Sequence, residues 1–168
     1  MEHSKGHMLD TNIFGDLMEG AFRLEDLPSD GQFWATPVQW EEISKAPYNV
    51  KAKFKELIFD QKTIVPAAFA WNVPGAGWDQ GEWRLDGKVW HDIKKDLDDA
   101  LEKGWAGQPQ QPKEEEKKRK KENNSKDASI AEAAMFYGFT LITRDGALAK
   151  AAEKHGIKVL NPKGQSHG

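Results

Sequence analysis

Short apolar runs alternate with segments of helical spacing at the start of the chain. Met8 and Leu9 predict a buried strand, and apolar residues three and four apart over 13–18 predict a helix that ends at Gly20. Residues 1–7 are polar, and we expect them to be a frayed end or a tag remnant. The fold is therefore expected to begin at Met8.

The next segment predicts two more strands with helices between them. Aromatic residues over 33–37 favour a second strand, and helical spacing begins at Val38. Pro47 interrupts this spacing, which resumes over 51–59. The apolar run 63–66 then predicts a third short strand.

The end of the chain has the clearest pattern. Asn124 and Ser125 are good N-cap residues for a helix over 127–137. Strands and a helix are predicted after it over 139–143, 147–155 and 157–160. Because alternating strands and helices are typical of a parallel, doubly wound sheet, we expect an α/β fold.

Length and composition narrow the class of protein. The chain has 168 residues, enough for one domain with a core and an insertion. It has no cysteine, which excludes disulfides and thiolate metal sites. No apolar run approaches the roughly 20 residues of a membrane span, and the N-terminus lacks the apolar part of a signal peptide. We therefore expect a cytoplasmic protein that does not bind a membrane.

Tryptophan is concentrated in one stretch. Residues 71–105 hold five of the seven tryptophans, with an irregular or hairpin loop expected over 78–87 and an amphipathic helix over 89–101. This stretch is either an aromatic platform for stacking bases or a small additional core beneath an inserted loop. The second interpretation is the simpler one.

A highly charged segment follows a spacer at 107–112. Residues 113–126 carry seven Lys or Arg against four Glu and no apolar side chain. A solvated helix face or a flexible loop accounts for this composition, and the alternative is a basic arm that contacts a phosphate backbone. The net charge of −3 for the whole chain gives no general nucleic-acid signature, so any such surface must be local.

Several acids are expected to meet at one edge of the sheet. Asp10 and Asp145 follow two predicted strands, Asp127 begins a predicted helix, and Glu41 or Glu42 lies early in the helix after the second strand. Singly, each acid has an ordinary role as a helix cap or a surface residue. Together they would repel one another unless a divalent cation neutralised them, and oxygen ligands favour Mg²⁺ or Mn²⁺. Such a site is suited to activating water at a phosphodiester.

Four short motifs carry a resemblance to a known family. The motifs are Leu9-Asp10-Thr11-Asn12, Glu42-Ile43, Asp127-Ala128-Ser129-Ile130-Ala131 and Leu141-Ile142-Thr143-Arg144-Asp145. Together they resemble the PIN-domain nucleases, above all the VapC-like toxin ribonucleases. Glu41 is a close rival to Glu42 as the second acid.

The resemblance implies a fold and a domain division. The fold would be a three-layer α/β/α sandwich with a mainly parallel central sheet of four to five strands, plus the Trp-rich insertion. The whole chain, 1–168, would form a single domain. Its core would comprise about 8–66 and 124–162, with the insertion and charged linker at about 67–123.

The resemblance also implies an activity. It suggests a metal-dependent endoribonuclease, the toxin of a toxin–antitoxin pair, with Asp10, Glu42, Asp127 and Asp145 as catalytic carboxylates. The metal, Mg²⁺ or Mn²⁺, would be held by Asp10, Asp127 and Asp145. Implied partners are an RNA substrate, an antitoxin protein and a second copy of the chain. Supporting roles would fall to Thr11, Asn12, Glu41 and Thr143, and Arg144 would meet a phosphate of the substrate.

Other functions remain open. A non-catalytic PIN-like scaffold that binds RNA or protein is one alternative, and an RNA-processing nuclease outside toxin–antitoxin systems is another. A haloacid-dehalogenase-type phosphatase would need an acid at Asn12, and a receiver domain would need one after the third strand, so neither class fits.

Overall fold

A computed structural model describes residues 6–29, 32–60, 63–64, 67–68, 81–82 and 88–162. The first half holds the elements β1 (Gly6–Leu9), α1 (Asn12–Met18), η1 (Leu24–Asp26), β2 (Gln32–Trp34), α2 (Pro37–Ile43), α3 (Tyr48–Phe54), the π-helical turn η2 (Lys55–Phe59), β3 (Ala67–Ala68) and β4 (Gly81–Glu82). The second half holds α4 (Lys88–Ala106), α5 (Glu114–Tyr137), β5 (Thr140–Ile142), α6 (Gly146–Lys154) and β6 (Val159–Leu160).

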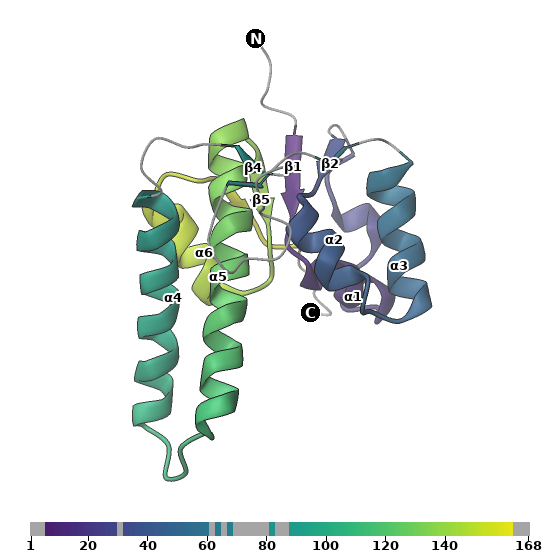
Figure 1. Ribbon diagram of the computed structural model, residues 1–168. Coiled ribbons are helices and arrows are strands. Elements are labelled where there is room, and N and C mark those ends of the chain that lie inside the picture. Colours follow the sequence, from purple (N-terminus) through teal and green to yellow (C-terminus); the bar gives the residue numbers. More distant parts are fainter. Residues whose placement is uncertain are drawn as a thin grey trace, which may run out of the picture.

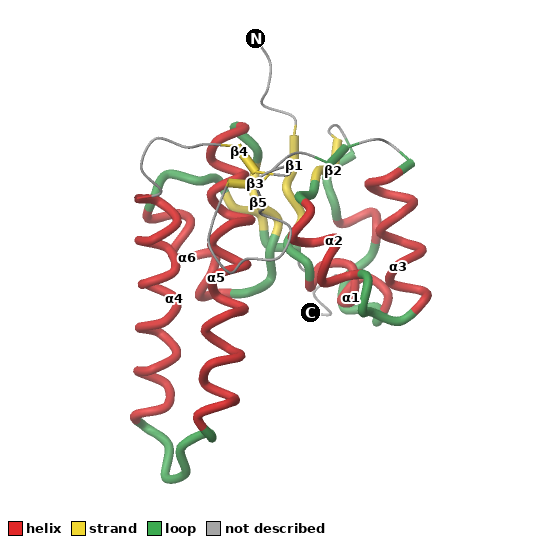
Figure 2. Tube along the Cα trace, in the orientation of Figure 1, coloured by secondary structure: helices red, strands yellow, loops and turns green. Residues whose placement is uncertain are grey.

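Four parallel strands form the central sheet, in the order β2-β1-β5-β6 (Figures 1 and 2). In the register of the sheet, Met8 of β1 lies opposite Trp34 on one side and Leu141 on the other. The two central strands are therefore the first and the fifth in the chain, so segments more than a hundred residues apart lie side by side. The expected α/β fold with a parallel sheet is confirmed.

Successive residues of a strand point to opposite faces of the sheet. Because apolar residues occupy both faces here, helices cover both. Met8 and Leu141 are buried in a core shared with α4, α5 and α6, whereas Leu9 and Ile142 are buried in a second core shared with α1 and α3. Two cores separated by one sheet make three layers, the arrangement that the resemblance implied.

The first strand begins earlier than the sequence pattern indicated. Gly6 and His7 belong to β1, and His7 is buried. A Cβ on Gly6 would lie 2.2 Å from the ring of Phe139, so a larger residue there would have to displace that ring. The expectation that residues 6 and 7 are a frayed end is wrong, because the sheet and the Phe139 ring hold them.

The helix that contains Asp127 also begins earlier than predicted. α5 is continuous from Glu114 to Tyr137, so Asn124 and Ser125 do not cap it and Asp127 does not lie in its first turn. Glu and Lys have high helix propensity, and pairs such as Lys120–Glu116 support the exposed turns. Gly138 ends the helix in the left-handed conformation.

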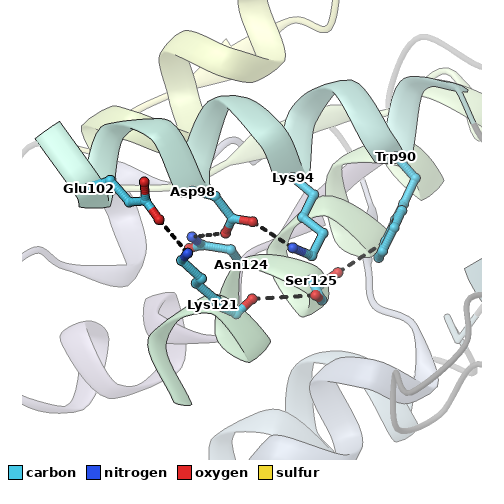
Figure 3. A network of polar contacts seen from close by, with 7 residues as sticks. All are labelled: Trp90, Lys94, Asp98, Glu102, Lys121, Asn124 and Ser125. Carbon is cyan, nitrogen blue, oxygen red and sulfur yellow. Dashed lines mark hydrogen bonds and ion pairs between the residues drawn. The ribbon is translucent and has the colours of Figure 1, made fainter. Parts of the chain in front are cut away.

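α4 and α5 form a long antiparallel hairpin that projects beyond the rest of the molecule (Figure 1). Polar contacts join the two helices along much of its length (Figure 3). The Asn124 amide donates to Asp98 Oδ1 at 2.9 Å, and the Trp90 indole N–H donates to the carbonyl of Ser125 at 3.1 Å. Most of the charged segment is thus part of a helix that packs against α4.

The Trp-rich stretch lies partly outside the described residues. Trp71, Trp78, Trp83 and most of the loop predicted over 78–87 fall there. Trp105 is buried, with the Lys117 ammonium 5.4 Å from the centre of its ring, so this tryptophan packs within the hairpin. The division of the chain into core and insertion stays a prediction.

The third predicted strand is also only partly described. Ile64 forms a parallel bridge with Ala35, and Val65 and Pro66 lie outside the described residues.

None of the helices in the described ranges combines the length and the apolar character needed to cross a membrane.

Candidate functional site

The candidate site lies where β1 and β5 end. Asp10 directly follows β1, and its backbone N–H donates to the carbonyl of Ile142 at 3.0 Å, which extends the sheet by one residue. Only 2% of Asp10 is exposed. The carboxyl edge of a parallel sheet is where ligands of open α/β folds bind, so Asp10 is both buried and well placed for chemistry.

A single hydroxyl links Asp10 to the acid after β5. Thr143 Oγ1 donates to Asp10 Oδ2 at 2.9 Å and accepts the backbone N–H of Asp145 at 3.0 Å. The Asp145 carboxylate is exposed and caps α6, because its Oδ1 accepts the N–H groups of Ala147 and Leu148. Asp145 is therefore an N-cap, and its Oδ2 is not used in that cap.

A second hydroxyl links the end of β1 to α2. Thr11 Oγ1 donates to Glu42 Oε1 at 2.8 Å and makes no capping bond to its own helix, α1. Glu41 instead pairs with Lys45, which follows the end of α2, at 3.3 Å. Glu42, and not Glu41, therefore contacts Thr11, the residue that follows Asp10.

Asp127 joins this group from α5, where it is half-buried in the middle of the helix. Burial raises the pKa of Asp127 well above its usual value, and the charges of Asp10, Glu42 and Asp145 raise it further. Lys126, the preceding residue, opposes this rise. Asp127 therefore lies within electrostatic reach of the other three predicted acids.

The other two shifted acids respond in the same direction. Burial raises the pKa of Asp10 from 3.8 to about 6; Asp145 and Glu42 add to the rise, while the Thr143 hydroxyl and the Thr11 backbone oppose it. Burial also raises the pKa of Glu42, against the effect of the Thr11 hydroxyl and of nearby lysines. Ionisation of Asp10, Glu42 and Asp127 at this edge of the sheet therefore costs free energy, and a bound cation would lower that cost.

The donor set fits a hard divalent cation. Oδ1 of Asp10 is buried and accepts no hydrogen bond from the described residues, which leaves this oxygen available as a ligand. All four acids supply oxygen, the donor that Mg²⁺ and Mn²⁺ prefer. No three Asp, Glu or His side chains within the described ranges are already grouped as a coordination sphere, so an ion would require side-chain rotation or bridging waters.

The two remaining predicted residues border the acids. Asn12 is exposed at the start of α1, and Arg144 pairs with Asp16 at 3.4 Å. Both line a cavity of about 660 Å³ that also touches Glu42 and Asp145. Asn12 and Arg144 therefore lie beside the acids without contacting Asp10 through any hydrogen bond found in the described residues.

The sequence pattern did not reveal one residue that positions the site. Gln39 is fully buried; its amide N–H donates to the carbonyl of Leu9 at 2.9 Å, and its Oε1 accepts the backbone N–H of Thr36 at 2.8 Å. It thereby ties the end of β1 to the start of α2, one turn before Glu42. In the sequence, this role is indicated only by the position of Gln39, a polar residue on the same helix face as the apolar Ile43.

Comparisons with known proteins give slight similarities only. No family model and no curated protein matches the chain. Among solved structures, FitAB bound to the IR36 DNA fragment is similar, with 15% identity over 96% of this chain and 98% of that chain and a TM-score of 0.48. FitAcB from Neisseria gonorrhoeae is similar with 14% identity over 93% and 97% of the two chains and a TM-score of 0.39. Because both TM-scores are low, the function rests on the residues of the site.

Proposed function

We propose that the chain is a divalent-metal-dependent endoribonuclease of the PIN type, with Asp10 at its centre. The observation that carries the proposal is the buried Asp10 carboxylate, whose Oδ1 has no hydrogen-bond donor in the described part of the chain. A buried, partly unpaired carboxylate beside three further acids is costly unless a cation binds. This cost supports a site that binds a metal rather than one with a structural role alone.

In this proposal Asp10, Asp127 and Asp145 hold Mg²⁺ or Mn²⁺, directly or through water. The ion, when bound, would lower the pKa of a water molecule and stabilise negative charge on the phosphate. Glu42 approaches from α2, and the Thr11 hydroxyl fixes its orientation. Thr143 holds the Asp10 carboxylate in place, so its role is positioning.

RNA as the substrate rests on the resemblance of the four motifs to the PIN-domain nucleases. The same resemblance supports a toxin role, with an antitoxin protein and a second copy of the chain as partners. Arg144, at the border between the acids and the cavity, supplies a cation for a substrate phosphate once its pair with Asp16 opens. A scaffold that binds without cleaving would have no use for the buried Asp10 and Asp127, whose pKa values neighbouring acids raise further.

Incubation of the purified chain with total cellular RNA tests this function. Fragments that form with Mg²⁺ or Mn²⁺ and not with EDTA support a nuclease. Intact RNA under both metals contradicts the proposal and favours the scaffold.

A further inference from the structure

A cavity of about 660 Å³ adjoins the acids on the side of α1, α2 and α3. Thr11, Glu42 and Asp145 line it and also belong to the site, so whatever occupies the cavity lies next to the reacting group. Its volume falls within the roughly 300–1,000 Å³ of small-molecule pockets.

The part of the cavity away from the acids combines apolar and amide side chains. Met18, Ile43 and Val50 contribute apolar surface, and Asn12 and Asn49 contribute amides. Both asparagines are exposed and make no side-chain hydrogen bond to another described residue. An amide carries a donor and an acceptor, the combination that reads the edge of a nucleobase, while apolar surface accommodates its faces.

Four acids and one arginine contribute the charges that line the cavity. Glu42 and Asp145 belong to the acid group, and Asp16 pairs with Arg144 at 3.4 Å. Glu19, an exposed residue at the end of α1, is the other acid in the lining. The part of the lining formed by Asn12, Met18, Ile43, Asn49 and Val50 is uncharged and suits an uncharged planar group.

An exposed aromatic residue is next in the chain to residues that line the cavity. Tyr48 is 85% exposed, and it lies in the chain between two lining residues, Pro47 and Asn49. Its ring stacks on no other ring among the described residues. An exposed ring next to a base-sized cavity is suited to stacking on a second, neighbouring base.

We propose that this cavity binds the base of an RNA nucleotide adjacent to the scissile phosphate. Asn49 and Asn12 read the edge of that base, and Tyr48 stacks on the next one. The position relative to the cut rests on the proposed nuclease function, whereas base binding does not depend on cleavage. The cavity thus sets the sequence preference of the enzyme.

Binding of the sixteen RNA dinucleotides in EDTA tests the proposal, followed by chemical shifts of the ¹⁵N-labelled full chain. We expect dinucleotides with one particular base to bind about tenfold more tightly than the rest, with shifts at Asn12, Asn49 and Val50. Asn49→Ala removes the discrimination. Tyr48→Ala weakens all dinucleotides about tenfold, and Tyr48→Phe, which keeps the ring, does not.

Two results would overturn the inference: absence of dinucleotide binding, as expected if the cavity takes a peptide, or a base preference that Asn49→Ala leaves intact. Lys95→Ala, on the outer surface of α4, is the matched control and changes neither quantity. Because EDTA prevents metal-dependent cleavage, dinucleotide binding without any RNA cleavage would contradict the nuclease alone. Cleavage without dinucleotide binding would contradict the base pocket alone.

Discussion

The Thr143 hydroxyl donates to Asp10 at 2.9 Å and accepts the backbone N–H of Asp145 at 3.0 Å. These residues end two neighbouring strands that are more than 130 positions apart in the chain. One side chain therefore fixes the distance between the buried acid and the exposed acid. Its loss affects both.

Thr143→Val keeps the shape of the side chain and removes the hydroxyl. We expect a loss of about 1–3 kcal/mol in the free energy of unfolding at pH 7, because the Asp10 carboxylate loses its donor and the Asp145 N–H its acceptor. Urea unfolding measures this change. Thr143→Ser keeps the hydroxyl and is expected to stay near wild type; equal stability of the Val and Ser variants would contradict the role of the hydroxyl.

The raised pKa of Asp10 predicts a pH dependence of stability without added metal. The folded chain holds the Asp10 proton up to about pH 6, whereas the unfolded chain releases it near 3.8. The folded state is therefore favoured below pH 4, and this contribution is lost as the pH rises through 6.

Asp10→Asn removes this ionisation. We expect the variant to exceed wild type by up to about 3 kcal/mol at pH 7 and to lose this advantage at pH 4. Urea unfolding of both proteins in EDTA at the two pH values measures the difference. An advantage that is the same at pH 4 and pH 7 would show that ionisation of Asp10 is not its cause.

Metal binding is expected to offset the loss of stability that the buried carboxylate charge causes. Mn²⁺ at 100 times its dissociation constant should stabilise the wild-type chain by about 2.7 kcal/mol, since the ion binds the folded state alone. Thermal unfolding with and without Mn²⁺ measures this gain. Asp10→Asn should lose most of the gain, and Asp99→Asn, which changes an exposed acid on α4, should keep it; equal gains in all three proteins would place the ion elsewhere.

The two neighbouring glutamates should differ in their effect on cleavage. Glu42→Gln removes the carboxylate that Thr11 orients, and we expect kcat to fall about 100-fold. Glu41→Gln breaks only an exposed pair with Lys45 and should leave kcat within about twofold. Kinetics on one RNA substrate with both variants decides between the glutamates, and a larger loss in Glu41→Gln would reverse the assignment.

Polar contacts between α4 and α5 are expected to stabilise the hairpin. Asp98 accepts from Asn124 at 2.9 Å and from Lys94 at 2.5 Å, so Asp98→Ala leaves a buried amide and a half-buried ammonium without this acceptor (Figure 3). We expect a loss of about 1–2 kcal/mol in urea unfolding. Asp99→Ala, one residue along on the exposed face, serves as the control. A comparable loss of stability in Asp99→Ala would mean that helix propensity, and not the contacts between α4 and α5, is responsible.

The fold could be predicted where a structural feature depends on residues that are close in the sequence. Asp10 and Asp145 directly follow apolar runs, and the edge of a parallel sheet collects whatever follows its strands. Gly20 and Gly156 end their helices with φ of 78° and 80°, as expected of glycine. These features depend on neighbours in the chain and can be read from it.

Contacts with distant partners could not be read in the same way. The start of β1 depends on Phe139, and Gln39 is held by Leu9 and Thr36. The charged half of α5 has no apolar side chain, so hydrophobic spacing could not reveal a helix there. α4 supplies the partners for Lys121 and Asn124, and nothing in the local sequence indicates them.

Metal-dependent cleavage that requires Asp10 is the most direct test of the proposed nuclease. Wild type, Asp10→Asn and Asp99→Asn should be compared on the same RNA with Mn²⁺ and with EDTA. We predict cleavage by wild type and Asp99→Asn with Mn²⁺ and none by Asp10→Asn, although that variant is folded. Full cleavage by Asp10→Asn, or equal cleavage in EDTA, would contradict the account.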